Sequence, residues 1–286
     1  MSHTLRYEVN CSILFTELPL LERPAAARGA GFDAIELWWP FATAVPTDAE
    51  ADALVRAVTD AGVALVGLNF FAGDMPGGDR GLMSWPGREL EVRENIAATL
   101  ELGARLGCRT YNALYGNRIE GVAPQEQDEL ATANLTLAAS SAAASGGSTV
   151  LVEPVSGAPR YPLLTAADAL RVIDRVGADN LALLADLYHL AVNGDDVDAV
   201  IAEHVDRIAH VQVADSPGRG EPGSGHLELD RQLGDLQAAG YAGWVGLEYK
   251  PTGSTEDSFA FLDHERRASH ATQARTPSEQ SRSTGA

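Results

Sequence analysis

Short apolar segments alternate with amphipathic segments along almost the whole chain, and no other feature constrains its fold as strongly. The apolar segments are rich in Val, Ile and Leu, which is typical of parallel β-strands covered on both faces. We expect strands at residues 7–12, 34–38, 64–69, 110–114, 149–155, 181–186, 208–214 and 244–249. Parallel strands need crossover connections, and the segments between these strands are long enough to supply them as helices.

The segments between the strands carry apolar residues at helical spacing. Residues 48–61 end just before Gly62, where a helix would take its C-cap. Thr165 stands three residues before Asp168, a spacing close to that of a capping box. We expect helices at residues 48–61, 89–106, 124–145, 165–176, 195–204, 230–239 and 256–263.

The alternation predicts an α/β protein that folds as a single-domain (β/α)8 TIM barrel. A doubly wound open sheet is the alternative, but no glycine-rich fingerprint follows the first expected strand. We assign the catalytic barrel to residues 1–263. Residues 264–286 contain almost no large apolar side chains, so we predict a disordered C-terminal tail there.

Composition excludes several classes of partner. The formal net charge of −19 at pH 7 would repel phosphate backbones and anionic lipid, so we expect neither nucleic acid nor a membrane as a partner. The two cysteines, Cys11 and Cys108, form no metal-binding motif and fit a reducing compartment. No signal peptide or membrane-spanning run is visible, so we expect a cytoplasmic protein.

Four of the expected strands end in a side chain that can bind a metal through oxygen. These residues are Glu153, Asp186, Gln212 and Glu248, which lie about one strand–helix unit apart. A lone Glu at a strand end is more often a solvated loop residue, but the C-terminal ends of barrel strands converge on one site. Carboxylate and amide oxygens favour hard divalent cations, so the pattern predicts a Mg²⁺ or Mn²⁺ site.

Further polar residues are expected around the same mouth of the barrel. His189 follows Asp186 by three residues, and Arg219 lies in a loop rich in glycine and proline. We predict that both contact the substrate, with Arg219 binding a carboxylate through its planar fork. Asn69 and Lys250 are weaker candidates for substrate contact, because a structural role explains them equally well. Asn10, Glu36 and Asn112 lie at other strand ends.

Two glutamates on opposite sides of a chelated substrate suit proton transfer next to a carbonyl. Glu153 and Glu248 would act as general acid and base, one removing a proton from carbon and the same or the other returning one. The chemistry would be aldose–ketose isomerisation or epimerisation. Metal-assisted hydrolysis is the competing use, and it commonly relies on several His ligands that these strand ends lack.

The residues around these positions resemble the hydroxypyruvate isomerase family, within the xylose isomerase-like barrels. The resemblance rests on EPV at Glu153, ADLYH at Asp186, HVQVADSPGRGEPGSG at Gln212 and GWVGLEYKP at Glu248, and it extends over residues 5–263. It implies interconversion of hydroxypyruvate and tartronate semialdehyde (2-hydroxy-3-oxopropanoate), with a small hydroxy-oxo acid as the partner. It also implies that Glu153 and Glu248 are the acid–base pair and that His189 and Arg219 contact the substrate. The metal ligands that it implies are Glu153, Asp186, Gln212 and Glu248.

Several alternatives stay open. The superfamily's epimerases usually have His where this chain has Gln212, so the chain departs from that pattern at one of the expected metal ligands. A 2-oxo-tetronate isomerase shares the same motifs, a ketose 3-epimerase would need no carboxylate contact, and a sugar-acid-binding barrel would not be an enzyme. Endonuclease activity is disfavoured by the negative charge. The sequence does not determine the assembly state, and a homo-oligomer is among the options.

Overall fold

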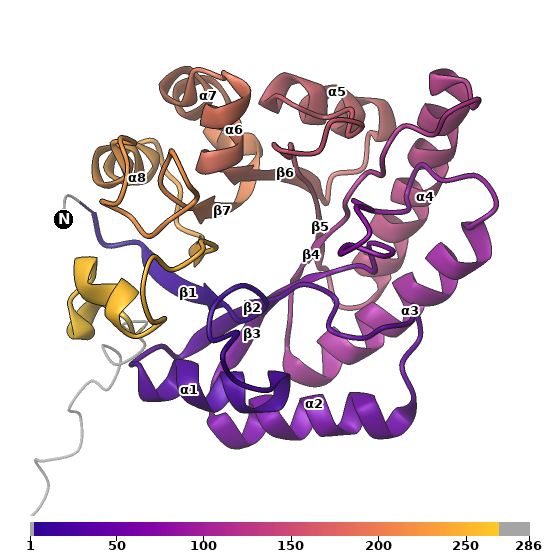
Figure 1. The fold of residues 1–286 in the computed structure, drawn as a ribbon. Helices are drawn as coiled ribbons and strands as arrows, with labels where there is room; N and C mark the ends of the chain where they lie inside the picture. Colours follow the sequence, from indigo (N-terminus) through magenta and orange to yellow (C-terminus); the bar gives the residue numbers. More distant parts are fainter. Residues whose placement is uncertain (1–2, 269–286) are drawn as a thin grey trace, which may run out of the picture.

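Eight parallel strands close into one barrel in the computed structural model, which describes residues 3–268 (Figure 1). Each strand pairs with its neighbours in sequence, and the last strand pairs with the first. The strands are β1 (Arg6–Asn10), β2 (Ala34–Leu37), β3 (Ala64–Asn69), β4 (Thr110–Asn112), β5 (Thr149–Val152), β6 (Leu181–Asp186), β7 (Ile208–Val213) and β8 (Trp244–Leu247). This topology confirms the predicted (β/α)8 barrel and excludes the doubly wound sheet.

Helices surround the barrel and connect its strands (Figure 1). They are α1 (Arg23–Gly29), α2 (Asp48–Ala61), α3 (Glu89–Leu106), α4 (Pro124–Ala144), α5 (Ala166–Val176), α6 (Leu187–Asn193), α7 (Val197–His204) and α8 (Leu229–Ala238). Helix α5 begins with a full capping box between Thr165 and Asp168, as its sequence suggested. Gly62 and Gly177 end α2 and α5 in the left-handed conformation that glycine adopts without strain.

Some elements differ from the sequence-based prediction. Helices α1 and α6 were not expected, because each has only seven residues and too few turns to display a periodic apolar face. The helix predicted at residues 256–263 is instead a 3₁₀ helix, Asp257–Phe261. Strands β5 and β8 end one residue before Glu153 and Glu248, so both glutamates lie just beyond the ladder.

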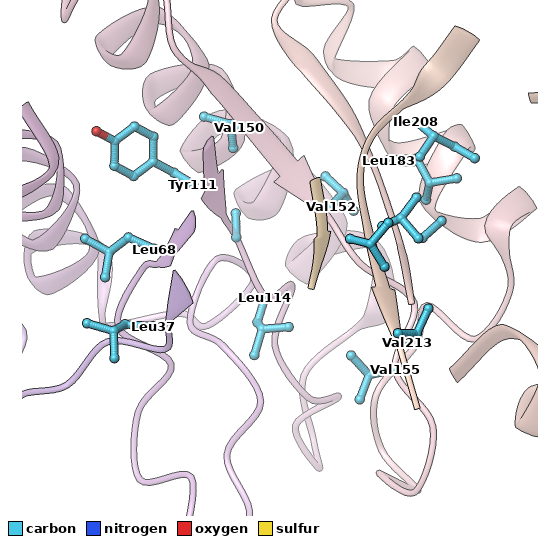
Figure 2. Packing of buried hydrophobic residues seen from close by; sticks show 14 of the residues in the cluster. Leu37, Leu68, Tyr111, Leu114, Val150, Val152, Val155, Leu183, Ile208 and Val213 are labelled. Atoms are coloured by element: carbon cyan, nitrogen blue, oxygen red, sulfur yellow. The ribbon is translucent and has the colours of Figure 1, made fainter. Parts of the chain in front are cut away.

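The side chains of β1 and β7 alternate between two environments. Tyr7, Val9, Val211 and Val213 belong to the apolar core, and Figure 2 shows part of this core, with Tyr111, Val150 and Leu183 among the labelled residues. The alternate positions carry buried polar residues, Glu8, Asn10, His210 and Gln212. Since successive side chains of a strand point to opposite faces, these polar residues face the barrel interior.

The ordered chain continues past the predicted domain boundary at residue 263. Residues His264–Arg266 form a 3₁₀ helix, and the Arg267 guanidinium donates to the backbone carbonyls of Ala30, Phe259 and Leu262. One arginine bound to three carbonyls thus holds the first residues after position 263 against the barrel. The remainder of the predicted tail lies outside the described residues. Among residues 3–268, no helix has both the length and the apolar character needed to cross a bilayer.

Candidate active site

A cavity of about 1150 Å³ opens at the C-terminal end of the barrel. Its lining includes the glutamates that follow β5 and β8 and all four residues that were predicted to contact substrate, namely Asn69, Glu153, His189, Arg219, Glu248 and Lys250. Asn69 is buried, whereas Lys250 is exposed. The end of the barrel that the sequence indicated is therefore hollow and lined by the expected polar groups.

The four predicted metal ligands lie close to one another and are buried. Asp186 and Gln212 are register partners in neighbouring strands. The Gln212 side chain donates a hydrogen bond of 2.6 Å to Glu248 Oε2. Ligand atoms of Glu153, Asp186 and His189 all lie within 4.8 Å of one another. All four candidate ligands are at most 5% exposed, so the site is shielded from bulk water.

Two oxygens of this group make no hydrogen bond within residues 3–268. They are Asp186 Oδ2 and Gln212 Oε1, and both are buried. The other carboxylate oxygen of Asp186 caps α6 by accepting from the backbone of Tyr188 and His189. Gln212 Oε1 has no donor among the described residues, which is costly for a buried acceptor. Asp186 Oδ2 instead makes longer ion-pair contacts, at 3.5 Å from Arg219 and from His189. A hard divalent cation would satisfy both oxygens. The residues present therefore fit such a cation.

Glu248 is surrounded by donors. Its Oε2 accepts hydrogen bonds from the Asn10 amide at 2.7 Å and the Trp38 indole at 3.3 Å, in addition to Gln212. Its Oε1 accepts from Arg219 Nη2 at 2.6 Å. Burial raises the pKa of Glu248 well above its ordinary value, although the Arg219 charge opposes this shift. Its carboxyl group is thus fixed in place and shifted toward the protonated form.

Glu153 has a different set of contacts. Its Oε2 accepts from the Asn112 amide at 2.6 Å, and its backbone carbonyl accepts from the Tyr161 hydroxyl at 3.0 Å. Burial, followed by the nearby Asp186 charge, raises the pKa of Glu153 to about 8. A carboxyl group that titrates near neutral pH is suited to both removing and returning a proton.

His189 presents one ring nitrogen to the site. Its Nδ1 accepts from the backbone N–H of Ser156 at 3.1 Å. Burial lowers the pKa of His189 to about 4, so the ring is neutral near pH 7. A neutral ring that accepts at Nδ1 carries its proton on Nε2, which lies 3.5 Å from Asp186 and 3.9 Å from Glu153. His189 therefore offers a donor to the cavity.

Arg219 contacts two of the candidate metal ligands directly. Besides its bond to Glu248, its Nη2 lies 3.5 Å from Asp186 Oδ2, and its guanidinium stacks 5.5 Å from the Tyr188 ring centroid. Its backbone has φ 61°, an unusual conformation for a non-glycine residue. The sequence predicted an arginine facing the substrate, but not this contact with the acidic residues.

Glu8 and His210 form a buried polar cluster that the sequence reasoning missed. His210 Nε2 lies 2.9 Å from Glu36 Oε2 and 3.5 Å from Glu8 Oε1, inside the barrel. Burial alone would lower the pKa of His210, but its contacts with Glu36 and Glu8 outweigh this and raise it to about 10. The available signal was the strand period of two, which places Glu8 on the face of Asn10 and His210 on the face of Gln212.

Comparisons with known proteins agree with the fold. Residues 24–265 match the family model described as xylose isomerase-like TIM barrel. The chain is 53% identical to the "Putative hydroxypyruvate isomerase" of Streptomyces coelicolor, over 92% of this chain and 97% of the relative. It is 32% identical to the hydroxypyruvate isomerase of Escherichia coli, over 91% and 98% of the two chains. It is 33% identical to a 2-oxo-tetronate isomerase of Cupriavidus necator, over 90% and 97%.

A solved structure has the same architecture. It is described as an AP endonuclease of family 2 from Brucella melitensis, and it superposes with a TM-score of 0.82. Its sequence is 35% identical to this one, over 90% of this chain and 97% of that chain.

Proposed function

Because the chain belongs to the xylose isomerase-like TIM barrel family, we propose that it interconverts hydroxypyruvate and 2-hydroxy-3-oxopropanoate. The enzyme class is that of the hydroxypyruvate isomerases it matches along most of its length. The observation that carries the proposal is the pair of buried glutamates, Glu153 and Glu248, which line one cavity and have raised pKa values.

The reaction moves hydrogen between neighbouring carbons without a change in overall composition. In our proposal, one glutamate removes a proton from C3 of hydroxypyruvate, and the electron pair passes into an enediolate that spans C2 and C3. A proton is then returned to C2. The C3 hydroxyl loses its proton and becomes the aldehyde, and the C2 oxygen gains a proton and becomes the hydroxyl of the product. Glu153 and Glu248 are the proposed acid–base pair, and proton transfer by positioned groups of this kind typically contributes about 10²–10⁴-fold in rate.

Cationic and donor groups at the cavity would hold the acid substrate. We propose that Arg219 binds the carboxylate, with Lys250 adding positive charge at the mouth and the Nε2 proton of His189 donating to a substrate oxygen. Asn69, also in the cavity lining, is the remaining proposed contact. To bind the substrate carboxylate, the Arg219 guanidinium would have to share or exchange its bond with Glu248.

Glu153, Asp186, Gln212 and Glu248 are the residues we propose to hold a divalent cation. Its chemistry would be to polarise the substrate carbonyl and to stabilise the negative charge of the enediolate. The all-oxygen donor set favours Mg²⁺ or Mn²⁺ over softer metals. Gln212 Oε1 and Asp186 Oδ2, which make no hydrogen bond within residues 3–268, support this assignment.

The remaining parts of the proposal concern partners and location. The Brucella protein is described as an endonuclease, but a formal net charge of −19 disfavours contact with a phosphate backbone. The cysteines Cys11 and Cys108 are free and buried, which fits a reducing cytoplasm. A homo-oligomer is compatible with the proposal but is not required by the site, since every residue named comes from one chain.

The proposed function is tested by measuring the exchange of substrate protons with solvent, in addition to product formation. Hydroxypyruvate incubated with the protein in D₂O should gain deuterium at C3 by NMR, and E153Q and E248Q should each lower this rate by about 10²-fold or more. Circular dichroism verifies that both variants fold. Exchange within tenfold of wild type in both variants would refute the roles of the glutamates. A parallel panel with 2-oxo-tetronate and a neutral ketose separates the alternative substrates.

A further inference from the structure

Glu36 lies on the interior side of the site and connects to Glu248 through two amide groups. The Asn10 Nδ2 donates to Glu36 Oε1 at 3.0 Å and to Glu248 Oε2 at 2.7 Å. The Gln212 Nε2 donates to the same two oxygens, at 2.7 and 2.6 Å. An amide nitrogen carries two hydrogens, so both hydrogens of each amide are used in bridging these two carboxyl groups.

This double bridge determines which way each amide faces. Turning Gln212 over would place its oxygen against two carboxyl oxygens that now receive hydrogen bonds, which is unfavourable. In the observed orientation, Gln212 Oε1 is left without a donor and available as a ligand atom. Asn10 is fixed in addition by its Oδ1, which accepts from the Ser12 backbone at 2.9 Å.

Two glycines leave room for the Glu36 carboxyl group. A Cβ on Gly67 would lie 3.0 Å from Glu36 Oε2, and a Cβ on Gly246 would lie 2.9 Å from Glu36 Oε1. The second oxygen of Glu36 is occupied by His210 Nε2 at 2.9 Å. Glu36 is 5% exposed. A carboxyl group enclosed and contacted on both oxygens has little freedom to move, so it can impose an orientation on the groups it binds.

We propose that Glu36 is a positioning residue, which orients the Asn10 and Gln212 amides so that Glu248 is held in place and Gln212 Oε1 faces the ion site. This inference rests on the proposed function, because it assigns Glu36 a task within the same site. Glu36 is not among the residues that line the cavity. It acts on the chemistry through Gln212 and Glu248, in the way that outer partners of metal ligands fix the orientation of those ligands.

The experiment compares E36Q with E8Q. Glu8 is as deeply buried and lies beside both His210 and Glu36, but within residues 3–268 it makes no hydrogen bond to either amide. Mn²⁺ affinity is measured by titration calorimetry and by the EPR spectrum of the bound ion, and kcat and KM are measured separately. We expect E36Q to weaken Mn²⁺ binding by about tenfold to 100-fold and to lower kcat, with KM for hydroxypyruvate within about threefold of wild type. E8Q should stay within about threefold in all three quantities.

The two readouts separate failure of this inference from failure of the proposed function. If wild type isomerises hydroxypyruvate or binds Mn²⁺, but E36Q and E8Q behave alike, the positioning role is refuted. If wild type has no isomerase activity, the proposed substrate is wrong, and Mn²⁺ affinity alone decides the role of Glu36. Should E36Q fail to fold, N10A removes one of the two bridges. It should weaken Mn²⁺ binding by at least threefold, and unchanged binding refutes the inference.

Discussion

Gly246 provides a sharp test of how tightly the barrel interior is packed. It lies in β8, and a Cβ at this position would sit 2.6 Å from Glu8 Oε1 and 2.9 Å from both Glu36 Oε1 and Gln212 Cγ. Side-chain ends can often move away from such a contact. Here, however, all three groups are buried and the Glu36 and Gln212 ends are hydrogen-bonded, so displacing them breaks other bonds.

The expected cost of Gly246→Ala follows from this geometry. Overpacking a closed interior typically costs about 1–3 kcal/mol of unfolding free energy. At about 2–4 °C per kcal/mol for a domain of this approximate size, the Tm should fall by roughly 2–12 °C. The matched control is Gly29→Ala at the end of α1, where an added Cβ meets nothing within 4 Å. The control should change stability by less than about 1 kcal/mol, in the stabilising direction.

Urea unfolding followed by circular dichroism gives the midpoint and the m-value for each variant. If Gly246→Ala unfolded within about 0.5 kcal/mol of wild type at an unchanged m-value, the interior would be looser than described. The hydrogen-bonded arrangement around Glu36 would then lose its physical basis.

Two further predictions concern Glu153 and Arg219. Burial raises the pKa of Glu153 from 4.5 to about 8, so the folded protein retains a proton that the unfolded chain releases, and the unfolding free energy should fall as the pH rises from about 4.5 through 8. Denaturation in metal-free buffer at several pH values should show this slope in wild type and a smaller one in E153Q; equal slopes would contradict the assignment. Arg219→Ala should raise KM for hydroxypyruvate by about tenfold or more, and Arg219→Lys should be intermediate because it keeps the charge without the planar fork. Steady-state kinetics decide this, and an unchanged KM in the alanine variant would exclude a carboxylate contact.

The sequence predicted the barrel well because each strand and most helices carry a local signal. The capping box at Thr165 and the glycines that end helices could be predicted for each helix separately, from the few residues at its ends. The convergence of Glu153, Asp186, Gln212 and Glu248 followed from a general rule about strand ends, so it required no knowledge of loop conformation.

What escaped prediction depends on long-range contacts. The bond from Arg219 to Glu248 depends on a loop conformation with φ 61° at the arginine, which composition does not specify. The contact between Glu8 and His210 joins strands that are distant in the sequence. In the sequence, each residue is only a single polar position within an apolar strand, which does not indicate a partner. Anchoring of Arg267 depends on carbonyls at Ala30 and Phe259, again far from it in sequence.

The pairing of β1 with β8 has a consequence for synthesis of the protein. The Asn10–Glu248 hydrogen bond joins residues separated by 238 positions. A nascent chain emerging from the ribosome therefore cannot assemble the site until β8 has been released. Contacts of such high sequence separation form late and slowly. An incomplete chain that lacks β8 therefore also lacks Glu248, one of the two glutamates of the proposed acid–base pair.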